Sequence, residues 1–130
     1  MSERRFLVPQ GSEMLRDQYH FSQGAVVGNT IYVSGQGGWD AKFQLADNVA
    51  AQARQAFKNI ETVLKEAGAS LDDVVEINSF HLDMDQMNAT VEAMREAFPR
   101  HQPVWTAVGV TRLAMPAMLV EIKAVAVKRG

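Results

Sequence analysis

The last apolar run of the chain, from Val120 to Lys128, limits the possible folds most. It has the pattern of a β-strand whose apolar side chains point to both sides. Those pointing one way are Val120, Ile122, Ala124 and Ala126, and those pointing the other way are Val125 and Val127. A strand that is apolar on both sides is normally buried on both sides. Glu121 interrupts this run, and a carboxylate in such a strand is costly to bury unless it is paired or has a function.

The rest of the chain alternates between short β-rich runs and two helical patterns. Apolar residues recur at helical spacing over about 48–67, with Asp47 as the N-cap and Gly68 just beyond the helix, and again from about 85 to 98. Extended segments are predicted at 19–27, 30–34, 74–83 and in two runs within 103–128, whereas residues 1–18 resemble an irregular arm or a short edge strand. The order β-β-α-β-α-β-β predicts an α+β fold with a mixed sheet.

Three glycines follow the second predicted strand, at positions 35, 37 and 38. Such a cluster predicts backbone that turns tightly or comes close to another group. For Gly37 and Gly38, a tight turn is the simpler interpretation.

The predicted elements leave one face of the sheet uncovered. Two helices can cover only one face, yet the last strand is apolar on both sides. The sequence therefore predicts a homo-oligomer in which copies of the chain cover one another's sheets. The alternative is a semi-exposed apolar face, since much of any folded surface is apolar.

Bulk composition narrows the class of protein. The 130 residues predict a single domain over 1–130, and the net charge of −2 gives no basic field for nucleic acid or an anionic membrane. No apolar run has the length of a membrane span or a signal peptide, so a cytoplasmic location is expected. The absence of cysteine excludes disulfides, thiolate metal sites and cysteine catalysis, and the three histidines are too scattered to predict a metal site.

Six stretches carry a family resemblance. They are Phe21-Ser-Gln-Gly24, Ser34-Gly-Gln36, Ala51-Gln-Ala-Arg-Gln-Ala56, Glu66-Ala-Gly-Ala-Ser-Leu-Asp-Asp-Val-Val75, Asn88-Ala-Thr90 and Val120-Glu-Ile-Lys-Ala-Val-Ala-Val127. In this order they resemble the YjgF/Rid family, also called the reactive intermediate deaminase or endoribonuclease L-PSP family. The older ribonuclease label would require a basic groove with interleaved aromatic residues, which this composition does not supply.

The resemblance implies a chorismate-mutase-like fold, assembled as a homotrimer with clefts between subunits. It also implies hydrolysis of enamine or imine intermediates to keto acids and ammonia, without a cofactor. In the best-known branch, an arginine holds the substrate carboxylate and a glutamate near the C-terminus positions the attacking water. The glutamate corresponds to Glu121, and the arginine corresponds to Trp105.

Trp105 is the main departure from the family pattern. A guanidinium clamps a carboxylate through two charge-assisted hydrogen bonds, whereas an indole offers one N–H and no charge. We therefore expect reduced activity on simple 2-imino acids, unless Arg100, His101 or Arg112 replaces the missing arginine. Phe21 stands where the typical branch has a tyrosine, so both changes make the expected cleft more apolar.

The predicted site has Glu121 as the catalytic residue and five substrate-binding residues, which are Phe21, Gly35, Asn88, Trp105 and Ala107. Each main candidate has a structural alternative. Glu121 could pair with a lysine or arginine across an interface, Trp105 could be a core or interface aromatic, and Asn88 could be a solvated helix residue. The leading hypothesis is a trimeric deaminase acting on a small-molecule substrate, and the rival is a trimeric binding module without turnover.

Overall fold

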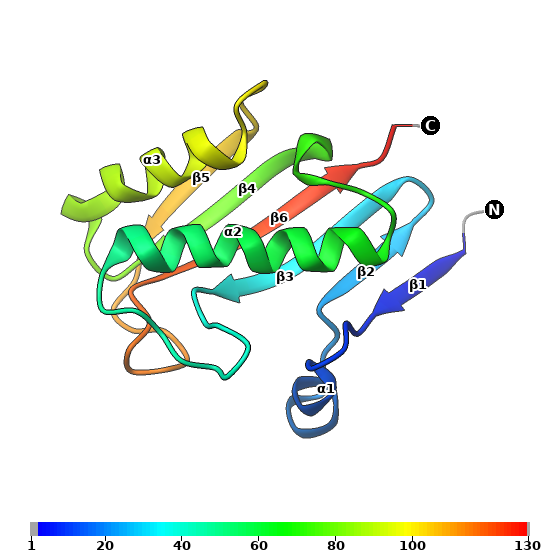
Figure 1. Ribbon diagram of the computed structural model, residues 1–130, viewed down its shortest axis with the longest axis horizontal. Coiled ribbons are helices and arrows are strands. Elements are labelled where there is room, and N and C mark those ends of the chain that lie inside the picture. The colour runs from blue at the N-terminus through cyan, green and yellow to red at the C-terminus, as the bar shows by residue number, and fades with distance from the viewer. Residues whose placement is uncertain (1–2, 130) are drawn as a thin grey trace.

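One mixed six-stranded sheet organises the protein (Figure 1). The structure is a computed structural model that describes residues 3–129. In spatial order the strands are β1 (Arg4–Leu7), β2 (Gly24–Val27), β3 (Thr30–Gly37), β6 (Val120–Val127), β4 (Val74–His81) and β5 (Val104–Gly109). Neighbouring strands are antiparallel except for β4 and β5, which run parallel. The predicted mixed sheet is confirmed.

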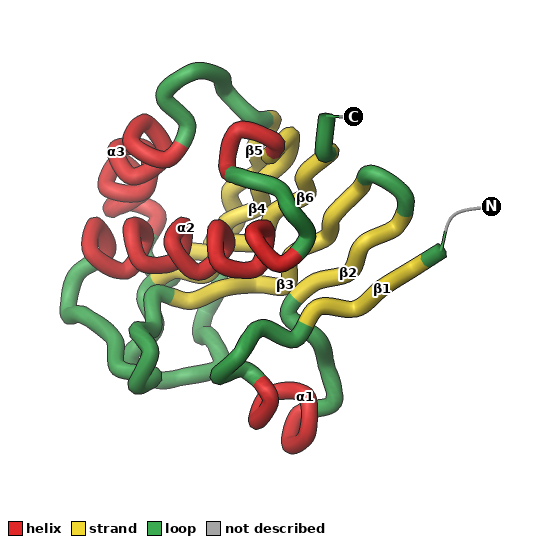
Figure 2. The backbone as a smooth tube through the Cα atoms, turned by 45° about the vertical axis from the view of Figure 1, so that its right-hand side comes forward, coloured by secondary structure: helices red, strands yellow, loops and turns green. Residues whose placement is uncertain are grey.

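Within residues 3–129, three α-helices accompany the sheet, namely α1 (Glu13–Tyr19), α2 (Val49–Glu66) and α3 (Met87–Ala97). Short 3₁₀ turns at Leu71–Asp73 and Met84–Gln86 lead into β4 and α3. Figures 1 and 2 show α2 and α3 side by side over one face of the sheet, whereas α1 lies apart from them, beyond the ends of β1 and β2. The sequence prediction of two helices on one face is confirmed, but it missed α1 and wrongly placed Tyr19 in a strand.

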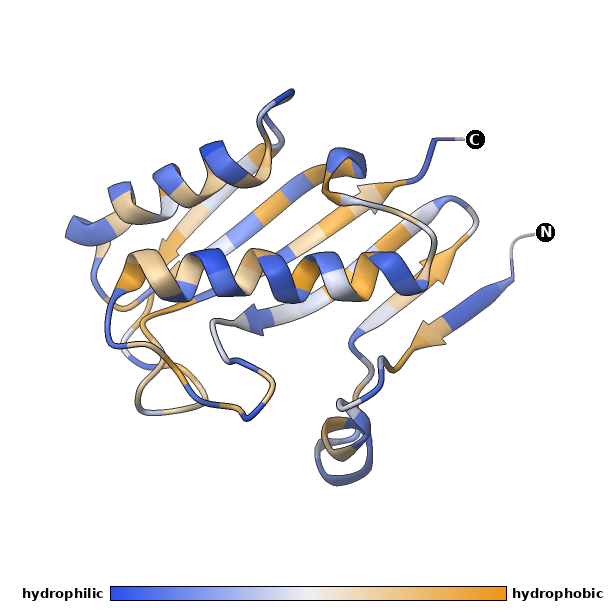
Figure 3. Cartoon of the chain, viewed as in Figure 1, coloured by the Kyte–Doolittle hydropathy of each residue, from blue (hydrophilic) through white to orange (hydrophobic). Residues whose placement is uncertain are grey.

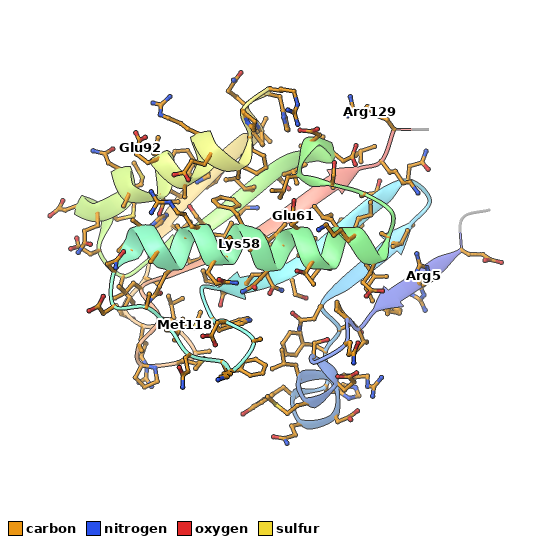
Figure 4. All side chains as sticks on the ribbon, viewed as in Figure 1. Arg5, Lys58, Glu61, Glu92, Met118 and Arg129 are labelled. Atoms are coloured by element: carbon orange, nitrogen blue, oxygen red, sulfur yellow. The ribbon has the colours of Figure 1, made fainter. Side chains whose placement is uncertain are left out.

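The core lies between the sheet and the two long helices. Its largest fully buried apolar side chains are Ile31, Ile60, Leu64, Ile77, Met118 and Ile122. The rings of Phe57 from α2 and Phe98, just after α3, meet edge to face with centroids 5.4 Å apart. Figure 3 shows α2 in alternating hydrophilic and hydrophobic bands, and Figure 4 shows Lys58 on this helix, where it is exposed.

The ends of α2 follow ordinary capping rules, with one correction. The side chain of Asn48, rather than that of the predicted Asp47, accepts a hydrogen bond from the Ala51 N–H at 2.8 Å. Because its oxygen satisfies a backbone donor of the first turn, Asn48 is the N-cap. After the helix, Gly68 has a φ of +72°, which a glycine adopts without strain, as the sequence predicted.

Gly38 lies against α2, which agrees with the second interpretation of the glycine cluster, the close approach of the backbone to another group. A Cβ atom at this position would overlap the backbone of Gln52, so only glycine lets β3 end this close to the helix. Gln52 is fully buried, and its amide donates to the carbonyl oxygens of Ala46 (2.7 Å) and Ala117 (2.9 Å). Its Oε1 accepts from the Leu119 N–H at 2.8 Å. One side chain thus fixes the loops that precede α2 and β6.

A register shift at the start of β4 changes which valine is buried. The sequence alternation placed Val75 on the same side as Ile77. In the structure the pairing with β6 shifts between Val74 and Glu76, so Val74 is buried with Ile77 and Val75 is 45% exposed. An extra residue in a strand moves every preceding side chain to the other face.

The face of the sheet opposite the helices, here called the open face, has no covering element among residues 3–129. The strand register places several large apolar side chains there, each at least 40% exposed. They are Phe6, Val27, Tyr32, Val104, Val108 and Val127. In the described part of the chain, no helix combines the length and the apolar character that crossing a bilayer requires.

Candidate active site

A β-bulge in β3 shapes the region around Glu121. Val33 pairs with Ala124 and Gln36 pairs with Ile122, so two residues of β3, Ser34 and Gly35, stand opposite Lys123 alone. Bulges of this kind bend a strand locally and often occur beside functional groups. Here the bulge brings the Gly35 backbone against the Glu121 side chain on the open face.

Gly35 must be glycine for Glu121 to lie where it does. A Cβ atom at position 35 would lie 2.5 Å from Glu121 Oε2 and 2.8 Å from its carboxyl carbon. Real Cβ atoms do not approach other atoms this closely, so any other residue would displace the carboxylate. This contact gives the predicted site residue Gly35 a physical role.

Glu121 is half-buried, and its carboxylate has no hydrogen-bond or salt-bridge partner within residues 3–129. Burial raises the pKa of the Glu121 carboxyl above its ordinary value, because the charged form loses solvation. A carboxyl group with a raised pKa and a free oxygen can take up and release protons closer to neutral pH than an exposed glutamate.

Ser34 holds the segment that carries Phe21 next to Glu121. Its N–H donates to the Gln23 carbonyl oxygen at 2.8 Å, and its hydroxyl donates to the Ser22 carbonyl oxygen at 2.7 Å. Phe21 is 41% exposed, so its ring is available at the rim.

Together these residues line a hollow of about 570 Å³ on the open face, here called the Glu121 hollow. Its lining combines aromatic, small polar and charged side chains, chiefly Phe21, Ser22, Tyr32, Ser34, Glu121 and Lys123. The sequence analysis missed Tyr32, Ser34 and Lys123. The alternation of β3 and β6 could have indicated Tyr32 and Lys123, because the first shares a face with Val125 and the second with Glu121.

Trp105 lies on the opposite side of the sheet from Glu121, so a single chain does not bring the two side chains together. Its register partner is the buried Ile77, and its ring packs against the core under α3. The indole N–H donates to Ser79 Oγ at 2.8 Å, so this donor is already used. The core-aromatic alternative therefore describes Trp105 within one chain.

Ser79 also forms a hydrogen bond with His81, so its hydroxyl links Trp105 to His81. Ser79 Oγ and His81 Nε2 are 2.7 Å apart, and both residues are buried. The hydroxyl accepts from the indole and can donate its own proton to Nε2 when that nitrogen carries no proton. Burial also lowers the pKa of His81, in agreement with a neutral ring. The three side chains thus form a chain of hydrogen-bonding groups on the helix-covered side of the sheet, in which Ser79 and His81 are buried and Trp105 is partly buried.

The other predicted binding residues do not line the Glu121 hollow. Ala107 pairs with the buried Ser79 and therefore belongs to the helix-covered side, and Asn88 is exposed near the start of α3. Of the three possible arginine substitutes, Arg100 pairs with Asp72 at 2.6 Å. His101 Nε2 lies 2.8 Å from the Val74 carbonyl oxygen, and Arg112 is exposed in the loop after β5. None of them lines the hollow.

Comparison with known proteins gives a consistent result. The family described as endoribonuclease L-PSP matches residues 13–128. The RutC family protein YjgH of Escherichia coli is 34% identical over 116 residues, with 88% of each chain covered. A human 2-iminobutanoate/2-iminopropanoate deaminase is 36% identical over 110 residues, covering 83% of this chain and 80% of the human protein.

A solved structure extends the likeness to the fold. Rv2704 from Mycobacterium tuberculosis, described as a member of the highly conserved YjgF/YER057c/UK114 family, matches with a TM-score of 0.85 and 33% identity. The match covers 96% of this chain and 99% of Rv2704. With matching sequence and fold over nearly its whole length, the chain belongs to the YjgF/Rid family, also described as the endoribonuclease L-PSP family.

Proposed function

We propose that this protein hydrolyses small enamines or imines to a carbonyl compound and ammonia, with the Glu121 carboxylate activating the water. The observation that carries the proposal is the half-buried, unpaired carboxylate of Glu121 beside a bulge and a ligand-sized hollow. Relatives named 2-iminobutanoate/2-iminopropanoate deaminase, at 36% identity, support the same reaction class.

The reaction needs one group that first accepts and then returns a proton. An enamine would first take a proton from solvent at its β-carbon, which gives the protonated imine. The Glu121 carboxylate would then take a proton from water as the water oxygen attacks the carbon of the protonated imine, which gives a neutral carbinolamine. Glu121 would return this proton to the nitrogen, the C–N bond would break, and ammonia would leave as the hydroxyl loses its proton to solvent and becomes the carbonyl. A carboxyl with a raised pKa suits both steps, because proton transfer is most efficient when the pKa is near the working pH.

Lys123 is the group that would meet a substrate carboxylate. Of the described residues lining the Glu121 hollow, only Lys123 carries a positive charge. It stands opposite the bulge, two residues from Glu121 on the same face. An ammonium is a point charge and cannot form the planar two-bond clamp of an arginine. We therefore expect weaker binding of simple 2-imino acids than an arginine would give.

We further propose a homotrimer in the cytoplasm, with the cleft completed between copies. The apolar open face supports the association, because side chains such as Val104 and Tyr32 would be buried by a neighbour. Since Trp105 and Glu121 lie on opposite sides of one sheet, only two different copies can bring them to a shared cleft.

The test measures release of keto acid and ammonia from a panel of imines generated in situ. We expect Glu121→Ala to lower kcat by about 10²-fold or more, the usual contribution of a general base. Lys123→Met should raise KM for imines that carry a carboxylate and leave neutral imines unaffected. Equal rates for wild type and Glu121→Ala on every imine would contradict the proposed reaction.

The second candidate is a trimer that binds a small molecule or a partner without turnover. The use of the Trp105 N–H by Ser79 favours it, because the position of the family's arginine then offers no polar group to a substrate. In this case the hollow binds a ligand, but no imine shows a rate that depends on Glu121.

A further inference from the structure

A second cleft, separate from the Glu121 hollow, lies between α2 and two loops. It has a volume of about 320 Å³, at the lower end of the range of small-molecule sites. One wall is the segment from Pro9 to Ser12, the other is the loop from Trp39 to Phe43, and the floor comes from α2 and the sheet. We call it the Gln23 cleft.

A buried amide nitrogen without a partner marks this cleft. Gln23 is 4% exposed, and its Nε2 has no hydrogen bond within residues 3–129. Its orientation is fixed, because Gln36 Nε2 donates both to the Ser34 carbonyl oxygen at 3.2 Å and to Gln23 Oε1 at 2.8 Å. A buried donor left without an acceptor is costly. Less than 1 Å² of this nitrogen is accessible to solvent, so a ligand acceptor reaches its two N–H protons only after a small shift of the lining side chains.

The wall formed by the loop from Trp39 to Phe43 carries two aromatic side chains. The rings of Trp39 and Phe43 lie 6.3 Å apart at 39° to each other. Phe43 has a left-handed backbone with a φ of +59°, a strained conformation for a bulky residue. Asp40 stabilises this turn, because its Oδ1 accepts from the backbone N–H groups of Lys42 (2.8 Å) and Gln44 (2.9 Å).

Polar groups on α2 complete the cleft. Asn59 donates to the carbonyl oxygens of Gly37 and Trp39, both at 2.9 Å, and accepts from Gln55 Nε2 at 3.0 Å. Gln55 thereby keeps its Oε1 free to accept a hydrogen bond. The one charged side chain among the described lining residues is Asp40, and its backbone hydrogen bonds hold its pKa low, so it stays negative and disfavours anions.

We propose that the Gln23 cleft binds an uncharged planar ligand with an amide or lactam group. The ligand carbonyl accepts from Gln23 Nε2, its N–H donates to Gln55 Oε1, and its ring packs against Trp39 and Phe43. This site is independent of the proposed deaminase reaction.

Nicotinamide is a suitable probe, and nicotinate is its matched anion. In ¹⁵N-labelled full-length protein, we expect nicotinamide to shift the indole N–H signal of Trp39 saturably and to leave that of Trp105 unmoved. Nicotinate should bind much more weakly because of Asp40. Gln23→Met, which keeps the side-chain length and removes the donor, should raise the Kd for nicotinamide about tenfold, the value of one hydrogen bond.

Three further variants complete the test. Trp39→Leu, which lacks the indole and is followed through the backbone N–H signal of Phe43, should also weaken binding. Gln102→Met, at an exposed glutamine elsewhere, and Glu121→Gln should bind nicotinamide as wild type does. If Gln23→Met does not fold, Trp39→Leu and the comparison of nicotinamide with nicotinate still test whether the Gln23 cleft binds the ligand. No saturable shift at Trp39, equal binding of nicotinate, or undiminished binding by Gln23→Met or Trp39→Leu would overturn the proposal.

Discussion

Glu121 lowers the stability of the folded chain at neutral pH, because burial raises its pKa above the ordinary 4.5. When folding raises the pKa of a carboxyl, the free energy of unfolding keeps its full value below the unfolded pKa. It falls as the pH rises through the folded pKa, because the buried group then becomes charged. Glu121→Gln removes this titration. We therefore expect Glu121→Gln to be more stable than wild type at pH 7, with a difference that shrinks as the pH falls through the raised folded pKa and is almost gone below pH 4.5.

Urea denaturation at several pH values measures this difference. The same variant should lose activity, so stability and function change in opposite directions, as at many catalytic groups. A Glu121→Gln protein that is equally stable or less stable at pH 7 would show that the carboxylate is well solvated or paired.

Gly35→Ala tests whether the bulge positions the carboxylate. The new Cβ would lie 2.5 Å from Glu121 Oε2, so the side chain must move and activity should fall at least about tenfold, since misplacement of a catalytic group by an ångström is costly. Gly109→Ala is a matched control at the end of β5, where the nearest atom, at 3.0 Å, belongs to the flexible Met84 side chain. Equal imine hydrolysis rates for the two variants would contradict a positioning role for Gly35.

Single residues also show how far sequence reasoning reaches. The carboxylate in an apolar strand pointed to Glu121, and the glycine cluster pointed to close backbone approach, which Gly35 and Gly38 both make. The face on which Trp105 lies could not be predicted, because it depends on the parallel pairing of β4 and β5, which no local pattern reveals. Lys123 was overlooked because a charged residue on a strand ordinarily indicates a solvated face.

Elements with a strong apolar period were predicted well, and short ones were not. The helix α2 has eight buried residues spaced along one side, and its predicted range of about 48–67 agrees with Val49–Glu66. The helix α1 has no buried residue, so it has no apolar stripe to recognise. Both bulges, at Ser34–Gly35 and at Val75, shift the alternation that strand prediction relies on.

The N-cap of α2 gives a test at the scale of an element. Asn48 accepts from the Ala51 N–H, so Asn48→Ala should lower the free energy of unfolding by about 1 kcal/mol. Asp47→Ala, one residue earlier, should change it by less than about 0.5 kcal/mol, because exposed positions outside the cap contribute little. Urea denaturation measures the free energy of unfolding of both variants. Equal decreases for the two would contradict the assignment of Asn48 as the N-cap.

The oligomeric state is a property of the whole molecule, and the structure of a single chain does not determine it. A strand that is apolar on both sides predicted an oligomer. Among the described residues, 3–129, the open face carries six large apolar side chains that are at least 40% exposed. The number of copies and the contacts between them depend on the surfaces of two chains together, so neither local pattern nor the fold of one chain determines them.

Val104→Asp tests the proposed assembly. This residue is 65% exposed on the edge strand, and a charge there would have to be buried in a contact between open faces. We expect light scattering after gel filtration to give a trimer for wild type and for Lys58→Asp on the outer side of α2, and a monomer for Val104→Asp. A monomeric wild type at micromolar concentration would contradict the trimer.

The central claim is that an ionised Glu121 in the hollow drives imine hydrolysis. It is tested most directly by kcat/KM for keto-acid release as a function of pH, after subtraction of the uncatalysed rate, for wild type and Glu121→Gln. The wild-type rate should rise with pH through a pKa above 4.5, because the base must be deprotonated. Glu121→Gln should be about 10²-fold slower or more and lack this rise. A Glu121→Gln enzyme with the wild-type rate and the same pH dependence would contradict the claim.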